Sequence, residues 1–330
     1  MKRMVWMQHV EEDELLAEQD VLLRSESVLL EEEQQRERFQ QILLFQEDQE
    51  QAEWIAQWEQ RQKKHWKTYL EHCKHRVIVR LLGEPLNTFL PHVGTECGAR
   101  RARHFGVSEA ELEQRVQMLL EFNPRLGMRG CRMAIEYDAL LDMQLRALFG
   151  AVTERGGDRI DILIPFVISA QETRTMKDRI ARVAQGYPAL QVKIGAELST
   201  PRAACVAGEI AGYVDFVVFD TMELTQMLYG MDWQDTRRVI NRYLELKLIE
   251  QSPFRQLDTV AVGSLLLMGL ADIRKKHPNC EVGVSGQPVT NEKSCKYCEE
   301  NGFDFIVLPA VLPDWMDGSE EMTGEDMVSQ

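Results

Sequence analysis

Residues 159–198 read RIDILIPFVISAQETRTMKDRIARVAQGYPALQVKIGAEL. Two mainly apolar runs, at 159–167 and 190–198, enclose an amphipathic segment at 170–185. Short apolar runs without strict alternation are typical of strands buried on both faces, and the segment between them has helical periodicity. This order of strand, helix and strand predicts two parallel strands joined by a helical crossover.

The same alternation continues in both directions along the chain. We expect further strands at 20–25, at 76–82, near Met128, and at 214–220, 281–286 and 304–309. We expect further helices at 109–122, 137–152, 201–212 and 257–277. These segments make about eight βα units, the number that closes a (β/α)8 TIM barrel of the α/β class. No linker rich in Pro, Gly or Ser divides the chain, so residues 1–315 are predicted to form one barrel domain.

Two segments depart from the βα pattern. Residues 29–73 are rich in Glu, Gln and Arg with apolar residues at helical spacing, which predicts a helical insertion of one long helix or two after the first strand. Its aromatic residues are expected to form a partly buried stripe packed on the barrel. Residues 316–330 are acidic and poor in apolar residues, which predicts a disordered tail.

Composition excludes several classes of partner. The chain has 330 residues, 44% of them apolar, and a formal net charge of -15. An acidic surface repels phosphate backbones and anionic lipids, so we expect neither a nucleic-acid partner nor a membrane partner. There is no signal-peptide pattern and no apolar run long enough to cross a bilayer. The sequence favours a cytoplasmic location.

The cysteines support the same location. Seven are scattered without a disulfide spacing, which favours reduced thiols. Cys295 and Cys298 form one CxxC pair, but a structural zinc site needs four ligands and no second pair is near. We interpret these two cysteines as neighbours on one face of a helix.

Arginines gather at the predicted strand ends. Arg24 and Arg80 each stand at the end of a strand, and Arg129 lies in the third unit. Active sites of such barrels lie at the C-terminal ends of the strands. Arginine binds phosphate and carboxylate groups through paired N–H donors. Three arginines meeting at one mouth therefore predict a site for a small anionic ligand.

Five ordered segments then resemble a known family. They are VLLRSE, VRLLGEPLNTFLPH, NPRLGMRGCR, VKIGAELSTPRAA and FDTMELTQ, which begin at residues 21, 79, 123, 192 and 219. Together they resemble the C-terminal barrel of the phosphoenolpyruvate-utilising enzymes, namely pyruvate phosphate dikinase, phosphoenolpyruvate synthase and enzyme I of the sugar phosphotransferase system. The resemblance covers roughly residues 20–315, and the second segment looks most like the dikinase.

The resemblance implies a phosphate site with altered chemistry. Arg24, Arg80 and Arg129 match the family's phosphate-binding arginines, although Gly83 replaces an aspartate that follows the second of them. In the segments that hold magnesium, Ser199 replaces a glutamate and Glu223 matches an aspartate.

Three further positions depart from the family's pattern. Met222 replaces an asparagine that contacts substrate, Asp220 replaces a glycine, and Ser285 replaces the proton-donating cysteine. Magnesium prefers carboxylate and water oxygens, which neither serine nor methionine supplies as well. A hydroxyl is also a much weaker acid than a thiol. Magnesium is therefore a possible cofactor whose ligands are not fully retained.

These changes favour a degenerate, stand-alone barrel without phosphotransferase activity. It is expected to act as an anion-binding, regulatory or scaffolding subunit. The family resemblance implies a homodimer, and a separate protein partner is possible. The domains that carry a phosphohistidine and bind ATP in the family are not expected within these 330 residues.

Two alternatives remain open. One is a divergent enzyme for a small phosphorylated or 2-oxo-acid substrate. Glu197 lies on the same face of its strand as Ser199, one layer deeper in the barrel, and a buried carboxylate needs a partner. That partner is either Lys193 or an arginine, or a displaced metal shared with Glu223. The other alternative is one subunit of a split phosphotransferase.

Overall fold

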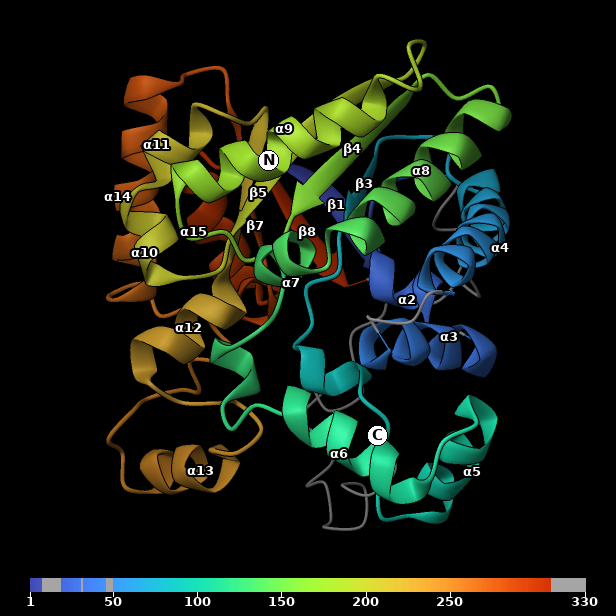
Figure 1. Ribbon diagram of the computed structural model, residues 1–330. Coiled ribbons are helices and arrows are strands. Elements are labelled where there is room, and N and C mark those ends of the chain that lie inside the picture. The colour runs from blue at the N-terminus through green and yellow to red at the C-terminus, as the bar shows by residue number, and fades with distance from the viewer. Residues whose placement is uncertain (8–18, 31, 46–49, 310–330) are drawn as a thin grey trace.

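The chain forms a closed barrel of parallel strands surrounded by helices (Figure 1). The structure, a computed structural model, describes residues 1–7, 19–30, 32–45 and 50–309. The strands are β1 (Lys2–Met7), β2 (Asp20–Arg24), β3 (Val77–Arg80), β4 (Arg159–Ile164), β5 (Gln191–Leu198), β6 (Phe216–Asp220), β7 (Glu281–Ser285) and β8 (Phe305–Pro309). Each strand pairs with the next, and β1 closes the barrel against β8. The TIM-barrel prediction is confirmed, while the predicted tail at 316–330 lies outside the described residues.

One predicted strand is wrong and one strand was missed. The strand predicted near Met128 does not form. The backbone there makes an isolated antiparallel bridge, from Arg129 to Pro85. The missing strand is β1, whose sequence KRMVWM begins with two charges. Its apolar run covers only residues 4–7, so the sequence signal of a buried strand is short. The helical insertion therefore follows the second strand rather than the first.

Helices cover the barrel and the mouth. They are α2 (Ser25–Leu29), α3 (Glu33–Leu44), α4 (Gln51–Glu71), α5 (Glu96–Phe105), α6 (Glu109–Leu119), α7 (Cys131–Glu136), α8 (Asp138–Glu154), α9 (Ala170–Ala184), α10 (Pro201–Cys205), α11 (Ala207–Ala211), α12 (Thr221–Tyr229), α13 (Arg237–Glu245), α14 (Val262–Lys276) and α15 (Glu292–Glu300), with short 3₁₀ turns η1 (Leu86–Phe89), η2 (Pro124–Leu126) and η3 (Gln287–Val289). The helix expected at 201–212 is divided at Val206 into α10 and α11.

Side chains fill the barrel interior. The inward-facing set shares almost complete burial and consists of Met4, Leu22, Ile78, Leu163, Phe216, Val218, Phe305 and Val307. The Phe216 ring occupies the space where any side chain on Gly195 would lie, because a Cβ there would come within 2.2 Å of the ring. The interior is thus a packed core, and ligands can enter only at its ends.

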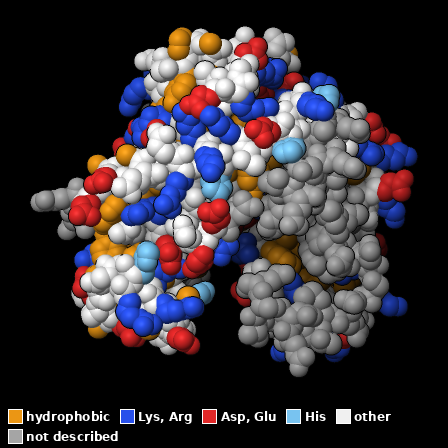
Figure 2. All heavy atoms as spheres, turned by 90° about the vertical axis from the view of Figure 1, so that its right-hand side faces the viewer, with side chains coloured by type: hydrophobic (Ala, Val, Ile, Leu, Met, Phe, Trp, Pro, Cys, Tyr) orange, Lys and Arg blue, Asp and Glu red, His pale blue; other side chains and the backbone are white. Residues whose placement is uncertain are grey.

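The insertion at 29–73 forms α3 and α4 and a second apolar core outside the barrel. Its aromatic side chains are buried, with Phe39 stacked on Trp58 at 5.3 Å and in edge contact with Phe89 at 5.1 Å between ring centroids. The α4 helix packs along α8. The predicted aromatic stripe does pack on the barrel, and its burial is more complete than the partial burial that was expected. Figure 2 shows that acidic and basic side chains alternate over the described part of this side of the molecule.

The remaining sequence expectations concern membranes and cysteines. Within the described ranges, no helix is both long and apolar enough to cross a membrane. All seven cysteines are free. Cys295 and Cys298 lie one turn apart on α15, and the Cys295 thiol donates to the carbonyl oxygen of Val289 at 3.0 Å.

Candidate functional site

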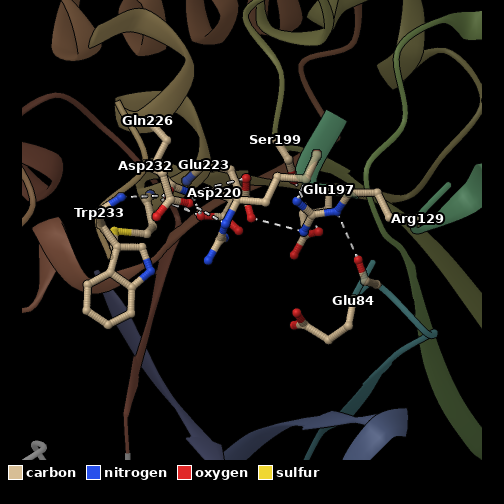
Figure 3. A network of polar contacts seen from close by, with 12 residues as sticks. Glu84, Arg129, Glu197, Ser199, Asp220, Glu223, Gln226, Asp232 and Trp233 are labelled. Carbon is tan, nitrogen blue, oxygen red and sulfur yellow. Dashed lines mark hydrogen bonds and ion pairs between the residues drawn. The ribbon is translucent and has the colours of Figure 1, made fainter. Parts of the chain in front are cut away.

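A cavity of about 520 Å³ opens at the C-terminal ends of the strands. Its wall contains the predicted residues Arg24, Arg80, Arg129, Glu197, Glu223 and Ser285. The strand register explains why these residues meet. Arg24 lies beside Arg80 in the register of β2 and β3, and Asp220 lies beside Ser285 in the register of β6 and β7. The structure therefore brings the predicted arginines and carboxylates together at one mouth (Figure 3).

Arg80, at the end of β3, is held by a carboxylate from β5, two strands away in the barrel. Its Nε donates to Glu197 Oε1 at 2.8 Å, and the Ser199 hydroxyl donates to Glu197 Oε2 at 3.2 Å. Burial alone would lower the pKa of Arg80, but Glu197, followed by Glu26 and Glu84, outweighs it and raises the pKa. Of the partners expected for Glu197, the one observed is an arginine, Arg80. Lys193 is exposed near the start of β5.

Arg129 is also paired within the chain. Its Nη2 donates to Glu223 Oε1 at 2.9 Å, and its Nε donates to the carbonyl oxygen of Gly83 at 3.2 Å. Its guanidinium lies 4.4 Å from the centroid of the Phe166 ring. Arg129 therefore donates its hydrogen bonds to acceptors within the protein.

The Phe166 platform depends on a strained backbone. Phe166 has φ of 59°, which is unfavourable for a bulky side chain, and it is packed against Gly130, which has φ of 55°. A Cβ on Gly130 would lie 2.6 Å from the Cβ of Phe166 and 2.9 Å from the carbonyl oxygen of Pro165. Only glycine therefore fits beside this platform.

The Gly130→Ala variant is expected to lose about 2–3 kcal/mol of unfolding free energy, because it combines a left-handed backbone with a backbone clash. Gly156→Ala is the matched control, since Gly156 has φ of 78° but a Cβ added there would meet no atom within 4 Å. The control is expected to lose about 1 kcal/mol. Equal losses in urea unfolding of the two variants would contradict the proposed clash.

Arg24 is the most open of the three arginines. Its side chain is 37% exposed, and its Nη1 lies 3.7 Å from Glu84 Oε1. Its guanidinium stacks 4.2 Å from the centroid of the Trp6 ring. Burial would raise the pKa of Glu84, but Arg24, Arg80 and Arg129 together lower it. Trp6 was missed because it lies on the strand β1, which was not predicted, and Glu84 because its position depends on the path of the loop between β3 and η1.

Asp220 is an acid in an unfavourable position. Its Oδ1 accepts from the backbone N–H groups of Met222 and Glu223 at 3.0 and 3.1 Å, which caps α12. Burial, and then the charges of Glu197 and Glu223, raise the pKa of Asp220 to about 7. Figure 3 shows the three carboxylates near one another, Glu197 from β5, Asp220 from the end of β6 and Glu223 from the first turn of α12. Asp220 thus holds a proton more readily than an ordinary aspartic acid.

A segment after α12 forms the rim of the cavity. Arg125 forms an ion pair with Asp232 and donates to Gln234 Oε1 at 3.3 Å. Gln226 accepts from the backbone N–H of Trp233 at 3.1 Å and donates to Glu223 Oε2 at 3.4 Å. The rim is thereby connected to the pair formed by Glu223 and Arg129. No signal in the sequence pointed to Arg125 or Asp232.

The side chains at the expected magnesium positions do not fit that ion as they are arranged. Ser199 is fully buried and donates to Glu197, and Glu223 is paired with Arg129. In the part of the chain that the structure describes, no group of three or more His, Cys, Asp or Glu side chains is placed to hold a metal ion. Ser285 offers only a hydroxyl, which lies 3.5 Å from the carbonyl oxygen of Phe219.

Comparisons with known proteins place this chain in a family. A family model described as PEP-utilising enzyme, PEP-binding domain matches residues 11–310. The chain therefore belongs to the family of PEP-utilising enzymes, through their PEP-binding domain.

Among its relatives are pyruvate, phosphate dikinases. The enzyme of Clostridium symbiosum is 34% identical and that of Rhizobium meliloti (strain 1021) is 37% identical, each over 240 residues that cover 70% of this chain. The match spans 27% of each dikinase, so this chain corresponds to about a quarter of their length. Among solved structures, the citrate synthase SbnG aligns over 93% of this chain and 85% of its own, with a TM-score of 0.41 and 9% identity.

Proposed function

We propose that this barrel binds a small carboxylate or phosphate without magnesium, performs no phosphoryl transfer, and serves as a regulatory subunit. The observation that carries the proposal is the chain of contacts from Ser199 through Glu197 to Arg80. The family resemblance implies a metal-binding carboxylate at the position of Ser199. The hydroxyl of Ser199 instead donates to Glu197, which is paired with Arg80. Phosphoryl transfer relies on metal ions to neutralise developing charge.

Unsatisfied donors support ligand binding at the mouth. The Nη1 of Arg80 and the Nε1 of Trp6 are buried and have no hydrogen-bond partner among the described residues. Each unsatisfied buried donor costs about 1–3 kcal/mol, which an oxygen of a ligand would recover. The half-exposed Arg24 guanidinium supplies a further donor on the same wall. A carboxylate or phosphate has the acceptor oxygens that these groups require.

A second candidate is a divergent enzyme that moves a proton on a 2-oxo acid. The observation in its favour is Asp220, which lines the cavity beside Ser285 and has a pKa raised to about 7 by burial and by neighbouring carboxylates. A group that titrates near neutral pH is suited to proton transfer. Exchange of the methyl protons of pyruvate in deuterated water, absent in Asp220→Asn, would favour this candidate.

The leading proposal predicts magnesium-independent binding of phosphoenolpyruvate. Calorimetry on the full chain is expected to give the same affinity with magnesium chloride and with a chelator. Arg24→Ala is expected to weaken binding about tenfold, since a charge-assisted hydrogen bond contributes about 1.5–3 kcal/mol. Arg238→Ala, an exposed arginine on α13, serves as the control and should have no effect.

Two outcomes would overturn this proposal. Binding that requires magnesium would indicate that the metal site is retained in another arrangement. An absence of binding under both conditions would show that the paired arginines are not available to an anion.

A further inference from the structure

A second cavity lies beside the mouth and is not part of the site described above. Its volume is about 540 Å³, and its wall is formed by α2, α3, the turn η1 and the start of α5. Phe39, Phe89 and Leu90 give it an apolar floor. Glu84 belongs to the walls of both cavities. The helical insertion thus creates a pocket that shares a boundary with the barrel mouth.

Two acceptor oxygens in this wall have no donor. Glu26 Oε2 and Gln40 Oε1 are buried and lack a hydrogen-bond partner among the described residues. The amide nitrogen of Gln40 already donates to the carbonyl oxygen of Phe89 at 3.0 Å, so its oxygen is the open side. A buried acceptor without a donor costs about 1–3 kcal/mol. The wall therefore requires N–H or O–H donors next to an apolar floor.

The charge of the wall residues favours a cationic N–H donor over a neutral O–H donor. The other acids of the wall are already paired, Glu33 with Arg101 and Glu84 with Arg24. Glu26 Oε1 lies 3.6 Å from Arg80 Nη1, but Glu26 differs from the other two acids because its buried Oε2 has no donor among the described residues. An ammonium group has three donors and a positive charge, and so suits the carboxylate of Glu26 better than a hydroxyl does. We propose that this cavity is a binding site for a small organic amine with an apolar body.

Glu26 also connects this site to the mouth. Its Oε1 accepts from the backbone N–H groups of Gly83 and Glu84 at 2.5 and 3.1 Å, in addition to facing Arg80. An ammonium group on Glu26 competes with Arg80 for this carboxylate and leaves Arg80 more available to an anion at the mouth. The amine and the anion then strengthen each other's binding, because coupling between sites is reciprocal. This step rests on the proposed function, whereas the amine site itself does not.

The site is tested with phenethylamine and its neutral isostere, 2-phenylethanol, on the full chain. Calorimetry is expected to give at least tenfold tighter binding of the amine. Cys97 is exposed on the cavity wall, and Cys97→Trp should weaken amine binding at least tenfold by filling the cavity. Cys205→Trp is the matched control at another exposed cysteine and should bind the amine normally. Equal affinity for amine and alcohol, or normal binding by Cys97→Trp, would overturn the site.

The coupling is tested separately. Saturating phenethylamine is expected to tighten phosphoenolpyruvate binding at least threefold, and an unchanged affinity would overturn the coupling while leaving the amine site intact. If phosphoenolpyruvate does not bind at all, the proposed function fails and hydrogen exchange decides the coupling. Faster exchange of the Gly83 and Glu84 amides with the amine present would then support the competition for Glu26, and unchanged exchange would refute it.

Discussion

Replacing Glu197 with alanine is expected to lower the free energy of unfolding by about 3–5 kcal/mol. The variant leaves the Arg80 guanidinium buried, with its Nε donor no longer satisfied by a carboxylate at 2.8 Å. Removing one partner of a buried ion pair costs more than the pair contributes, since the remaining charge stays desolvated. Glu26 offsets only part of this cost, because its oxygen lies 3.6 Å from Arg80.

Urea unfolding measures this loss, and the mouth offers a matched control. Glu84→Ala breaks the pair with Arg24, whose two side chains are 37% and 34% exposed, so its cost is expected to stay below about 1 kcal/mol. The double variant Glu197→Leu with Arg80→Met should recover much of the stability, because no buried charge remains. A loss below about 1 kcal/mol for Glu197→Ala would show that Arg80 is solvated, contrary to its burial.

The barrel could be predicted because its cause is local. Buried parallel strands are apolar runs separated by helical periodicity, and both patterns are visible without knowledge of tertiary contacts. The two wrong strand predictions fall where the apolar pattern of the sequence is weak. The β1 strand begins with two charged residues, whereas the apolar residues near Met128 belong to a loop that forms an isolated bridge, from Arg129 to Pro85, and no strand.

The candidate site was predictable only in part, for the same reason. Strand ends must meet at one mouth, so Arg24, Arg80 and Glu197 could be placed there from chain order alone. The side chains that contact these residues could not be predicted. Glu26 reaches Arg80 from α2, and Trp6 stacks on Arg24 from the strand that was missed. Such pairings depend on side-chain directions across different strands, which no sequence spacing specifies.

The raised pKa of Asp220 has a consequence for stability that can be measured. This pKa rises from 3.8 to about 7 in the folded chain because of burial and of repulsion from Glu197 and Glu223. A carboxyl group whose pKa is raised by folding contributes stability that is fully present below its unfolded pKa. That contribution is lost as the pH rises through the folded pKa. Asp220 therefore destabilises the fold progressively between about pH 4 and pH 7.

Asp220→Asn should remove this dependence while keeping the helix cap, since an amide oxygen can also accept from the N–H groups of Met222 and Glu223. Relative to the parent chain, the variant is expected to gain about 2–3 kcal/mol of unfolding free energy between about pH 5 and pH 8. Asp258→Asn is the control, because Asp258 accepts from the backbone N–H of Val260 at 2.8 Å outside the mouth. Parallel pH profiles for Asp220→Asn and the parent chain, measured by urea unfolding, would mean that Asp220 is not crowded by the neighbouring carboxylates.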